Sequence, residues 1–444
     1  MILLFFSIIL VFSTISILTS TLVLLNSNHI SYGIRVNDVP LSGLSKEAAL
    51  EKLKQSYAKT TATTELVQLD YQDQSWHIRP QDIDFKVDMD ATIDKAYSLG
   101  RNENILQGFI DRLDSAINGK EVPAIVTYDE DKLKVILQNI AKKTDHPSKN
   151  AECNLSAKGE LLITPEISGQ ILPIDEVADD LKKFILTLDL PKTIRLTLTA
   201  SNPKITASDL KGIDTVLSSY STQFNNGNYN RSENIRIAAA SLNHILSQPD
   251  ETTSFNALTG LRLAESGYQE APVLIDGKSV PDIGGGVCQV SSTLYNAVLL
   301  ANLKSVERTS HFYPSAYVPM GLDATVADHL LDFKFQNNLK HPIYLLTQVS
   351  QGTLSIYIVG NHEDFSPYKI SLQSTIDKTT PPAITFNYDK TLSSGRRITV
   401  DSGKTGYTVS AYRVKLQNGQ EVDREFLHTD IYSPENKVIL IGTR

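Results

Sequence analysis

Apolar residues fill almost every one of the first 25 positions, and nothing later in the chain has this character. None of Asp, Glu, Lys, Arg or His occurs before His29. About 20 apolar residues are enough to cross the hydrocarbon core of a bilayer. The stretch is longer than the apolar region of a typical signal peptide, and no clear small-residue cleavage site follows it. We therefore expect residues 1–25 to form a single uncleaved transmembrane anchor, whose orientation is left open because no basic flank precedes it.

After the anchor, short strand patterns alternate with helix-length amphipathic patterns, and their order occurs twice. A helix is predicted after Ser45, which is a good N-cap, and a break is predicted at Pro80. A matching break occurs about 85 residues later at Pro165, and a shared offset is typical of an internal repeat. We predict a duplicated α+β unit with copies at 30–120 and 121–202; a chance similarity of two α+β segments is the alternative. Neither copy contains residues that suggest catalysis, so binding or spacing is the expected role.

The next segment contains three consecutive glycines that lead directly into an apolar helix pattern. Gly284–Leu303 has the sequence GGGVCQVSSTLYNAVLLANL, in which Val287, Val290 and Leu294 fall on one helical face. Both helix and strand patterns surround it, so residues 205–362 are expected to form an α+β domain. The other elements predicted there are helices at 207–217 and 236–246, strands at 255–256, 271–275, 306–308, 317–319, 321–326 and 331–335, and a hairpin of 343–347 with 354–359.

From about residue 366 the helical periods disappear and strand patterns with turns continue to the last residue. Asn418-Gly419 stands between two alternating stretches, which is the strongest hairpin signal in the chain. We therefore predict a small β module over residues 366–444. The predicted fold class is a multidomain α+β chain with an N-terminal transmembrane helix, duplicated small α+β units, a central α+β domain with a cysteine at a helix N-terminus, and a C-terminal all-β module.

The composition of the chain argues against some classes of protein. The 444 residues are 41% hydrophobic and 21% charged, which is typical of chains that fold into packed cores. The net charge of −8 argues against a general nucleic-acid binder, whose surface is basic. The two cysteines, Cys153 and Cys288, are too few for a disulfide framework, although they would be able to pair in an exported protein.

Cys288 stands where the predicted central helix begins. A helix start carries free N–H groups and a partial positive charge, so a cysteine there loses its proton more easily and becomes a better nucleophile. The glycine run, Gly285 and Gly286 in particular, and the side chain of Gln289 are candidates for oxyanion donors. The alternative is that Cys288 is only a small buried residue where a helix meets a sheet.

A histidine and an aspartate follow Cys288 in an order that fits cysteine acyl chemistry, which needs a thiolate, a base and a group that orients the base. His311 is the candidate base and Asp323 the candidate orienting group. This order of helix cysteine, strand histidine and strand aspartate resembles that of transglutaminase-like and papain-like enzymes. In the alternative, His311 packs among aromatic residues and Asp323 caps a turn. The substrate-contact candidates are Ser292 and Tyr295 on the same helix, and Arg308, which would otherwise pair with Glu307 or Asp323.

No cofactor and no metal site are expected. His329 stands near Asp328 and Asp332, but these residues lack a clean metal-ligand spacing.

The residues from about Lys211 to Tyr344 resemble the VanW family. The motifs GGGVCQVSSTLYNA, ERTSHF, YVPMGLDATV and LDFKFQNN stand in the order of that family. One departure is visible, because the family pattern has Pro-Gly before Ser254-Phe255-Asn256 where this chain has Glu251-Thr252-Thr253. The resemblance implies a protein related to one encoded in vancomycin-resistance clusters, a family whose biochemical activity is not established.

The flanking segments resemble two further families. The duplicated region, through VNDVPLSGLSKEAALEKL, is similar to a peptidoglycan-binding domain, and SGKTGYTVSAYRVKLQNGQEVDREFLHTDIYSP resembles a G5 domain. Together the resemblances imply a cell-envelope protein that binds peptidoglycan or another cell-wall polymer, is anchored in the membrane by residues 1–25 and exposes the rest of the chain outside the cell. The alternative is a cysteine-dependent enzyme that transfers acyl groups or hydrolyses amides in cell-wall peptides through Cys288, His311 and Asp323.

Overall fold

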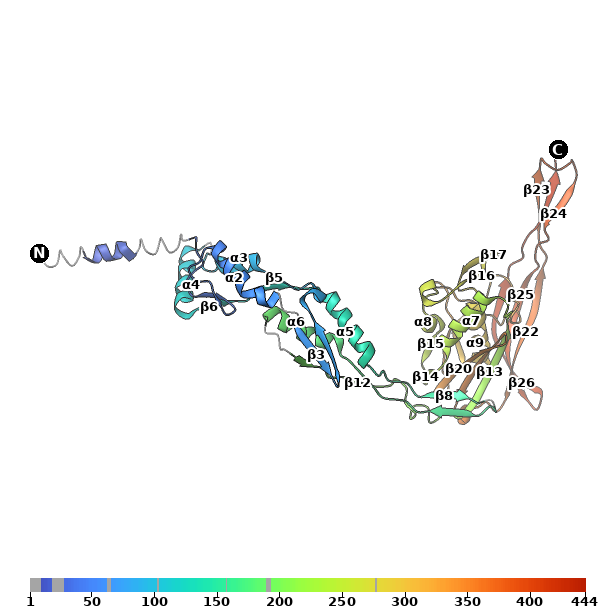
Figure 1. Cartoon of the computed structure of the whole chain (residues 1–444). Helices are drawn as coiled ribbons and strands as arrows, with labels where there is room; N and C mark the ends of the chain where they lie inside the picture. The colour runs from blue at the N-terminus through green and yellow to red at the C-terminus, as the bar shows by residue number, and fades with distance from the viewer. Residues whose placement is uncertain are drawn as a thin grey trace. The chain divides into compact units, whose positions relative to one another are not determined.

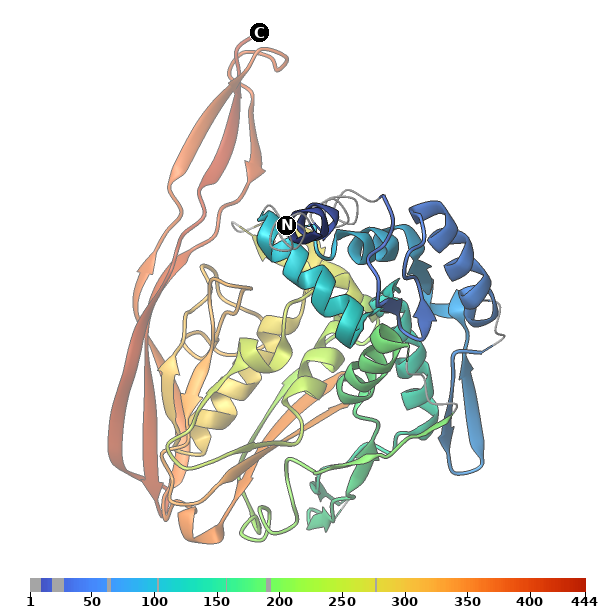
Figure 2. The same cartoon turned by 90° about the vertical axis from the view of Figure 1, so that its left-hand side faces the viewer.

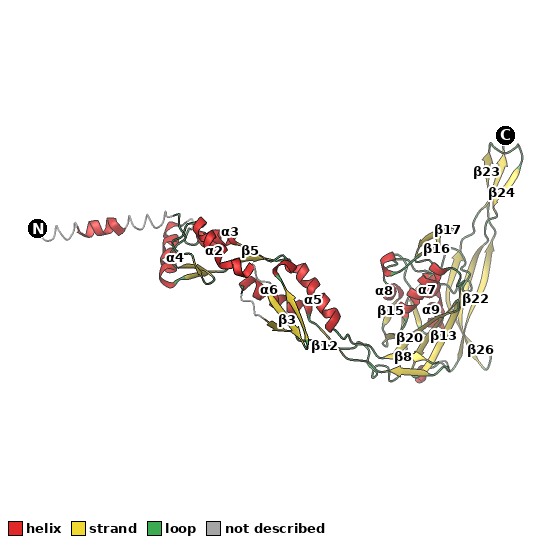
Figure 3. Cartoon of the chain, viewed as in Figure 1, coloured by secondary structure: helices red, strands yellow, loops and turns green. Residues whose placement is uncertain are grey.

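The computed structural model describes residues 9–17, 28–61, 65–101, 104–156, 158–188, 193–275 and 278–444, which form a mixed α+β chain with a C-terminal all-β module (Figures 1 and 3). The chain divides into two compact units. The N-terminal unit comprises Met1–Ser148 and Ser168–Asn202, and the C-terminal unit comprises Lys149–Ile167 and Pro203–Arg444.

The expected anchor at residues 1–25 falls mostly outside the described residues. Within it the structure describes only residues 9–17, which are helical and exposed. Across all the parts of the chain that are described, no helix combines the length and the apolar character needed to cross a bilayer.

The first part of the N-terminal unit has the helices α2, α3 and α4 beside a small sheet. The hydroxyl of Ser45 accepts a hydrogen bond from the backbone N–H of Ala48 at 3.2 Å, so the predicted cap is confirmed. Ile34, Leu53 and Ile93 are among its fully buried core residues. Its elements are β1 (Ile34–Val36), β2 (Val39–Pro40), α2 (Lys46–Thr61), α3 (Met89–Ser98), α4 (Ile105–Asn118) and β6 (Lys120–Val122).

The second part of this unit is built on α5 (Glu130–Thr144) and α6 (Ile174–Thr187). Its core joins Leu137 of α5 and Leu181 of α6 to Leu69 of a hairpin from earlier in the chain. Strand β3 of that hairpin pairs in parallel with β11, which follows α6. The remaining elements are β3 (Val67–Tyr71), β4 (Gln74–Ile78), η1 (Pro80–Ile83), β5 (Lys86–Asp88), β7 (Ile125–Thr127), β10 (Gly169–Ile171), β11 (Thr193–Arg195) and β12 (Thr199–Ser201).

The order of elements recurs along the chain, and each hairpin packs with the part that follows it. The series α2, β3, β4, β5, α3 is matched by α5, β8 (Glu152–Leu155), β9 (Leu161–Thr164), β10, α6. The β3–β4 hairpin enters the core of α5 and α6. The β8–β9 hairpin belongs to the C-terminal unit, where Cys153 packs with Tyr344. Residues 149–167, expected in the second repeat, therefore pack outside it, because their buried side chains complete the next core.

The C-terminal unit has a four-stranded antiparallel sheet in the order β13-β21-β20-β14, against which α7 (Tyr229–Leu242) and α9 (Val287–Leu300) pack. Apart from Cys288 and Leu300, every residue of helix α9 is buried. The strands of the sheet are β13 (Thr215–Gln223), β14 (Ile245–Ser247), β20 (Ile343–Ser350) and β21 (Thr353–Gly360). The other elements are β15 (Thr252–Ser254), α8 (Phe255–Thr259), η2 (Ala264–Ser266), β16 (Glu270–Ile275), β17 (Lys278–Ile283), β18 (Lys304–Glu307), β19 (Lys334–Gln336) and η3 (His362–Asp364).

Several predicted elements of this domain are wrong. The helix predicted at 207–217 is a series of turns followed by β13. The side chains of β13 that face α9 include the polar Ser218 and Thr222, so the strand lacks the apolar alternation by which it would be recognised. The strand predicted at 255–256 is the start of α8, because Ser254 caps it by accepting from Ala257. The helix predicted at 236–246 is α7 followed by β14, and 317–319 and 321–326 are irregular. The predicted hairpin of 343–347 with 354–359 is confirmed.

The C-terminal module consists of two three-stranded sheets and is elongated, with the last residue at its far tip (Figure 2). Asn418 and Gly419 both have positive φ, 53° and 82°, which gives the tight turn predicted between β25 and β26. Arg413 of this module donates to the carbonyl of Leu303, just after α9. The strands are β22 (Lys369–Thr380), β23 (Ile384–Asp389), β24 (Arg397–Asp401), β25 (Gly406–Gln417), β26 (Gln420–Tyr432) and β27 (Lys437–Gly442).

Candidate active site at the start of helix α9

The glycine run allows α9 to begin in close contact with its neighbours. Gly286 is the N-cap of α9 and has φ of 110°, a conformation that favours glycine. Gly285 lies so close to β16 that a Cβ atom there would stand 2.7 Å from the carbonyl oxygen of Ala271. Cys288 is the second residue of the helix and is partly exposed, whereas the rest of α9 from Val287 to Leu299 is buried. The sequence therefore places one partly exposed residue, Cys288, at the start of a buried helix.

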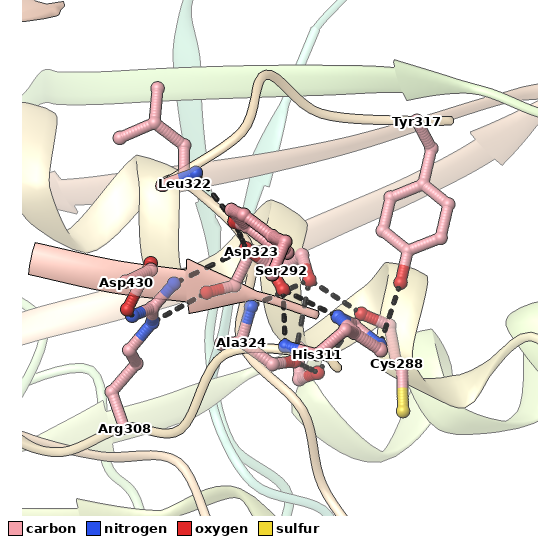
Figure 4. A network of polar contacts seen from close by, with 12 residues as sticks. Cys288, Ser292, Arg308, His311, Tyr317, Leu322, Asp323, Ala324 and Asp430 are labelled. Atoms are coloured by element: carbon pink, nitrogen blue, oxygen red, sulfur yellow. Dashed lines mark hydrogen bonds and ion pairs between the residues drawn. The ribbon is translucent and has the colours of Figure 1, made fainter. Parts of the chain in front are cut away.

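His311 and Asp323 are in direct contact beside this helix (Figure 4). The Nδ1 atom of His311 lies 2.5 Å from Oδ2 of Asp323. The backbone N–H of His311 donates to the same oxygen at 2.7 Å, so the carboxylate fixes both the ring and the main chain. Asp323 is 1% exposed and His311 14% exposed. The structure thus brings His311 and Asp323, the residues predicted as base and orienting group, into contact.

Two further side chains, those of Arg308 and Tyr432, hold Asp323 in place. Arg308 donates to the backbone carbonyl of Asp323 at 2.6 Å and to its Oδ1 at 3.2 Å. The same guanidinium reaches Asp430 of β26 at 2.5 Å. Tyr432, also on β26, donates its hydroxyl to Oδ1 of Asp323 at 2.6 Å. The C-terminal module thus contributes two residues to the surroundings of the carboxylate.

These contacts determine the charge states of the pair. Burial opposes ionisation of Asp323, but the hydrogen bond and charge of His311, with Arg308 and Tyr432, lower its pKa to about 2. Burial likewise opposes protonation of His311, but hydrogen bonds to Asp323 and Cys288 raise its pKa to about 9. An imidazolium beside a carboxylate is therefore the stable form of this pair at neutral pH.

The thiol of Cys288 is coupled to this imidazolium. Burial alone would raise the pKa of the thiol, but its hydrogen bond to His311 and the positive charge of that ring outweigh burial and lower it. Because Nδ1 of His311 is engaged by Asp323, Nε2 is the atom left to face the sulfur. The Sγ atom lies 3.4 Å from the carbonyl oxygen of Val326. The pKa of the thiol is lowered and that of His311 is raised, and both changes are in the direction of a thiolate–imidazolium ion pair.

Tyr317 is a site residue that sequence reasoning missed. Its hydroxyl lies 3.4 Å from Nε2 of His311, on the side of the ring that faces Cys288. Burial, followed by the charge of Cys288, holds the pKa of this hydroxyl well above its usual range, so it remains a hydrogen-bond donor. The motif YVPMGLDATV contains it, but no spacing rule connects a tyrosine in an irregular segment with a histidine ring.

Tyr432 and Asp430 were also missed, and no local signal points to them. The hydroxyl of Tyr432 contacts Asp323 across 109 residues of sequence. It also accepts a hydrogen bond from the backbone N–H of Gly321 at 2.6 Å. Only the packing of β26 against the central domain brings these groups together.

Several of the predicted contact residues have structural partners instead. Gln289 is 1% exposed, and its amide binds Thr222, Gln223 and Arg231. It therefore does not act as an oxyanion donor.

Ser292, Tyr295 and Arg308 are likewise engaged. The hydroxyl of Ser292 donates to the carbonyl of Cys288 at 2.8 Å and accepts from the N–H of Ala324 at 2.9 Å, which ties the Asp323 segment to α9. The hydroxyl of Tyr295 contacts His428 at 2.8 Å. Arg308 pairs with Asp323, which was the alternative to binding a substrate carboxylate.

The acidic residues near His329 also have protein partners. Asp328 forms an ion pair with Arg262, and Asp332 accepts from the hydroxyl of Ser254 at 2.6 Å. Cys153 and Cys288 are both free, so they do not form the disulfide considered from sequence.

Three family models match this chain in the predicted order. Residues 230–359 match the model described as "VanW like protein". Residues 76–192 match "Putative peptidoglycan binding domain", and residues 372–444 match "G5 domain". The three resemblances inferred from the motifs are therefore confirmed.

Two curated proteins are similar to part of the chain. The uncharacterized protein YoaR of Bacillus subtilis is 42% identical over 160 residues, which cover 36% of this chain and 53% of YoaR. The vancomycin B-type resistance protein VanW of Enterococcus faecalis is 30% identical over 147 residues, which cover 32% of this chain and 54% of that protein. The chain thus spans about half the length of the curated relatives it matches.

Two solved structures are similar to the C-terminal module. The crystal structure of HP0197-G5 is 21% identical and covers 17% of this chain and 100% of its own, with a TM-score of 0.13. The IgA1 protease G5 domain is 23% identical and covers 18% of this chain and 98% of its own, also with a TM-score of 0.13. On the family models alone, this chain carries a VanW-like domain, with a peptidoglycan-binding domain before it and a G5 domain after it.

Proposed function

We propose that this chain is a membrane-anchored protein of the cell envelope whose VanW-like domain transfers acyl groups from, or hydrolyses amides in, cell-wall peptides. The observation that carries the catalytic part is the 2.5 Å contact between Nδ1 of His311 and Asp323, which leaves Nε2 of the ring to interact with Cys288. The domain composition fits a cell-wall-associated protein. The anchor at residues 1–25 would hold the chain at the membrane, with the domains outside the cell.

In this mechanism the flanking domains bind the wall polymer and the central domain carries out the chemistry. The Cys288 thiolate attacks the carbonyl carbon of an amide, and a carbon–sulfur bond forms while the carbonyl π electrons move to oxygen. The oxyanion then collapses and the carbon–nitrogen bond breaks. His311 gives its Nε2 proton to the departing amine, which leaves a thioester on Cys288.

The second half of the cycle releases the acyl group. Neutral His311 accepts a proton from water, for hydrolysis, or from an acceptor amine, for transfer, as the oxygen or nitrogen attacks the thioester. The carbon–sulfur bond breaks and the thiolate–imidazolium pair is restored. Asp323 keeps its charge throughout, orients the ring and stabilises the imidazolium.

The start of α9 supplies the groups that would stabilise the oxyanion. Among the described residues, the backbone N–H of Cys288 has no hydrogen-bond acceptor. This N–H belongs to the first turn of the helix, where the macrodipole favours negative charge. It therefore replaces Gln289 as the expected donor.

The test is alkylation of Cys288 by iodoacetamide from about pH 5 to about pH 9 in full-length protein with Cys153→Ser. A lowered thiol pKa predicts rapid labelling well below the ordinary thiol range, and His311→Ala should abolish that low-pH labelling. The matched control is Cys288→Ser, which leaves only Cys153. Burial raises the pKa of Cys153, so it should react only on unfolding.

Two results of this alkylation experiment would contradict the catalytic proposal. If Cys288 reacts only on unfolding, or if His311→Ala leaves its pH profile unchanged, the catalytic proposal fails. The VanW-like domain would then be a wall-binding or positioning domain, and the cysteine a packing residue. If labelling follows the expected profile, peptidoglycan stem peptides are the first substrates to assay for thioester formation.

A further inference from the structure

Helix α4 is amphipathic, but its apolar face is directed outward. Leu106, Ile110, Leu113 and Ile117 follow one another at helical spacing, and they are 69%, 49%, 50% and 72% exposed. A helix on the surface of a water-soluble domain normally buries such a stripe against the core. This stripe is therefore a surface that lacks its partner among the described residues.

The opposite face of α4 is the one that packs on the protein, and it is made of small and polar groups. Gly108 and Ser115 are buried. A Cβ atom at Gly33 would lie 1.7 Å from the carbonyl oxygen of Ser115, so the two backbones are in contact there. Arg112 donates from Nε to the carbonyl of Gly100 at 2.8 Å. Because these contacts fix the helix by its polar side, rotation to bury the apolar side would break all of them.

The segment against which α4 packs follows directly on the apolar N-terminal stretch. Arg101, just before α4, donates to the backbone carbonyl of His29 at 2.7 Å, and Gly33 contacts the helix near its other end. Leu25 is only a few residues before His29, and an extended chain of that length spans at most about 14 Å. If residues 1–25 cross a bilayer, α4 is held within that reach of its surface.

From these observations we infer that α4 lies in the interface of the lipid bilayer, with Leu106, Ile110, Leu113 and Ile117 inserted among the acyl chains. An exposed apolar stripe on a helix of this length is the feature by which interfacial helices bind membranes. The stripe itself contains no charged residue, so burial of apolar area is the driving force rather than attraction to anionic headgroups. Tyr32, next to Gly33, is 60% exposed and is of the residue type that prefers the headgroup region. The inference rests on the membrane anchor of the proposed function and is independent of its chemistry.

The experiment uses the full-length chain with Cys153→Ser and Cys288→Ser, reconstituted into vesicles of phosphatidylcholine with or without phosphatidylglycerol. Ile110→Cys is labelled with an environment-sensitive dye, and Glu51→Cys on α2, which is also exposed, is the matched control. The dye at position 110 should emit at shorter wavelength and be quenched by nitroxide-labelled lipids in both kinds of vesicle. The dye at position 51 should remain in water.

Flotation of the vesicles distinguishes failure of the membrane anchor from failure of the α4 proposal. If the protein floats but the two dyes behave alike, α4 is not in the bilayer and the anchor stands. If the protein does not float and the dye at 110 stays in water, both the anchor and the α4 proposal fail. The emission of the dye at position 110 could also shift in the absence of vesicles, by an amount that grows with protein concentration. That result would assign the apolar stripe to self-association and would overturn the proposal.

Discussion

Asp323 is the residue on which the candidate site depends most. It accepts hydrogen bonds from His311, from Arg308 and from Tyr432, which belong to three separate segments of the C-terminal unit. A buried carboxylate is stable only if such partners compensate for lost hydration. Each partner can therefore be tested for its effect on the charge of this single group.

Removing the Tyr432 hydroxyl should weaken both folding and the site. Tyr432→Phe leaves a buried carboxylate with one donor fewer, and hydrogen bonds to charged groups contribute about 1.5–3 kcal/mol. We expect a loss of that size in the free energy of unfolding, measured with denaturant, and a rise in the pKa of Asp323. Tyr388→Phe, at an exposed position of the same module, is the control and should have no effect. Equal stabilities of the two variants would contradict the role given to Tyr432.

The raised pKa of His311 predicts how stability depends on pH. A group whose folded pKa lies above its unfolded value contributes stability that is fully present below the unfolded pKa and lost as pH rises through the folded pKa. For His311 the window runs from about 6.5 to about 9. The stability difference between the wild type and His311→Gln should therefore be largest, roughly 1–3 kcal/mol, at the lower end and decrease toward pH 9.

Denaturant unfolding at several pH values measures this difference. His146→Gln, which alters an exposed histidine of the N-terminal unit, should reproduce the wild-type curve. A pH-independent gap for His311→Gln would mean that the ring contributes by packing alone.

The sequence predicts the candidate site residues that lie close together in the chain. It does not predict the residues that distant segments contribute to the site. Cys288, His311 and Asp323 follow one another in an order that chemistry makes recognisable. Tyr432 is contributed by a strand of another module. Gln289 is a predicted oxyanion donor next to the cysteine, but a helix turns by about 100° per residue, and its side chain is buried against Thr222 and Arg231.

Among the elements, α9 determines where the thiol stands. Gly286 has φ of 110°, and a Cβ atom there would lie 3.0 Å from Cγ and 3.1 Å from the carbonyl oxygen of Arg231. Gly286→Ala should therefore cost more than the backbone strain of about 1–3 kcal/mol alone. It should also displace the first turn of α9 and abolish labelling of Cys288 at low pH.

A second glycine provides the comparison. Gly419 also has positive φ, 82°, but a Cβ atom there would meet nothing within 4 Å. Gly419→Ala should show the strain without the clash and should leave Cys288 labelling unchanged. If both variants label normally, the geometry of the glycine run does not control the thiol.

Elements whose buried face is apolar were predictable, and elements with polar contact faces were not. The apolar period of α9 and the alternation of β20 and β21 reflect burial directly. In β13 the side chains that meet α9 include Ser218 and Thr222, so the strand lacks an apolar alternation. The helix α4 packs through its polar face, and the sequence analysis did not predict it.

For the whole molecule, the two compact units predict two separate unfolding transitions. The chain has one tryptophan, Trp76, which packs against the core of the N-terminal unit. Cys153 is buried in the C-terminal unit. Tryptophan fluorescence and thiol accessibility in Cys288→Ser therefore report on different units, and their transitions should not coincide.

Core substitutions assign each transition to its unit. Leu137→Ala should destabilise the N-terminal unit by about 2–5 kcal/mol and shift only the fluorescence transition. Leu294→Ala, in the core around α9, should shift only the exposure of Cys153 by a similar amount. A single shared transition in both variants would mean that the units unfold together.

The forward packing of the hairpins has a consequence for how such a chain can change its length. The β3–β4 hairpin completes the core of the repeat after it, and the β8–β9 hairpin packs in the same manner with the VanW-like domain. The hairpin of each such repeat packs into the core of the part that follows it in the chain. An additional copy would therefore receive the hairpin of the copy before it and would pack its own hairpin into the part after it. Duplication or loss of a whole repeat would therefore change the length of chain before the VanW-like domain in fixed steps, without any new interface having to evolve.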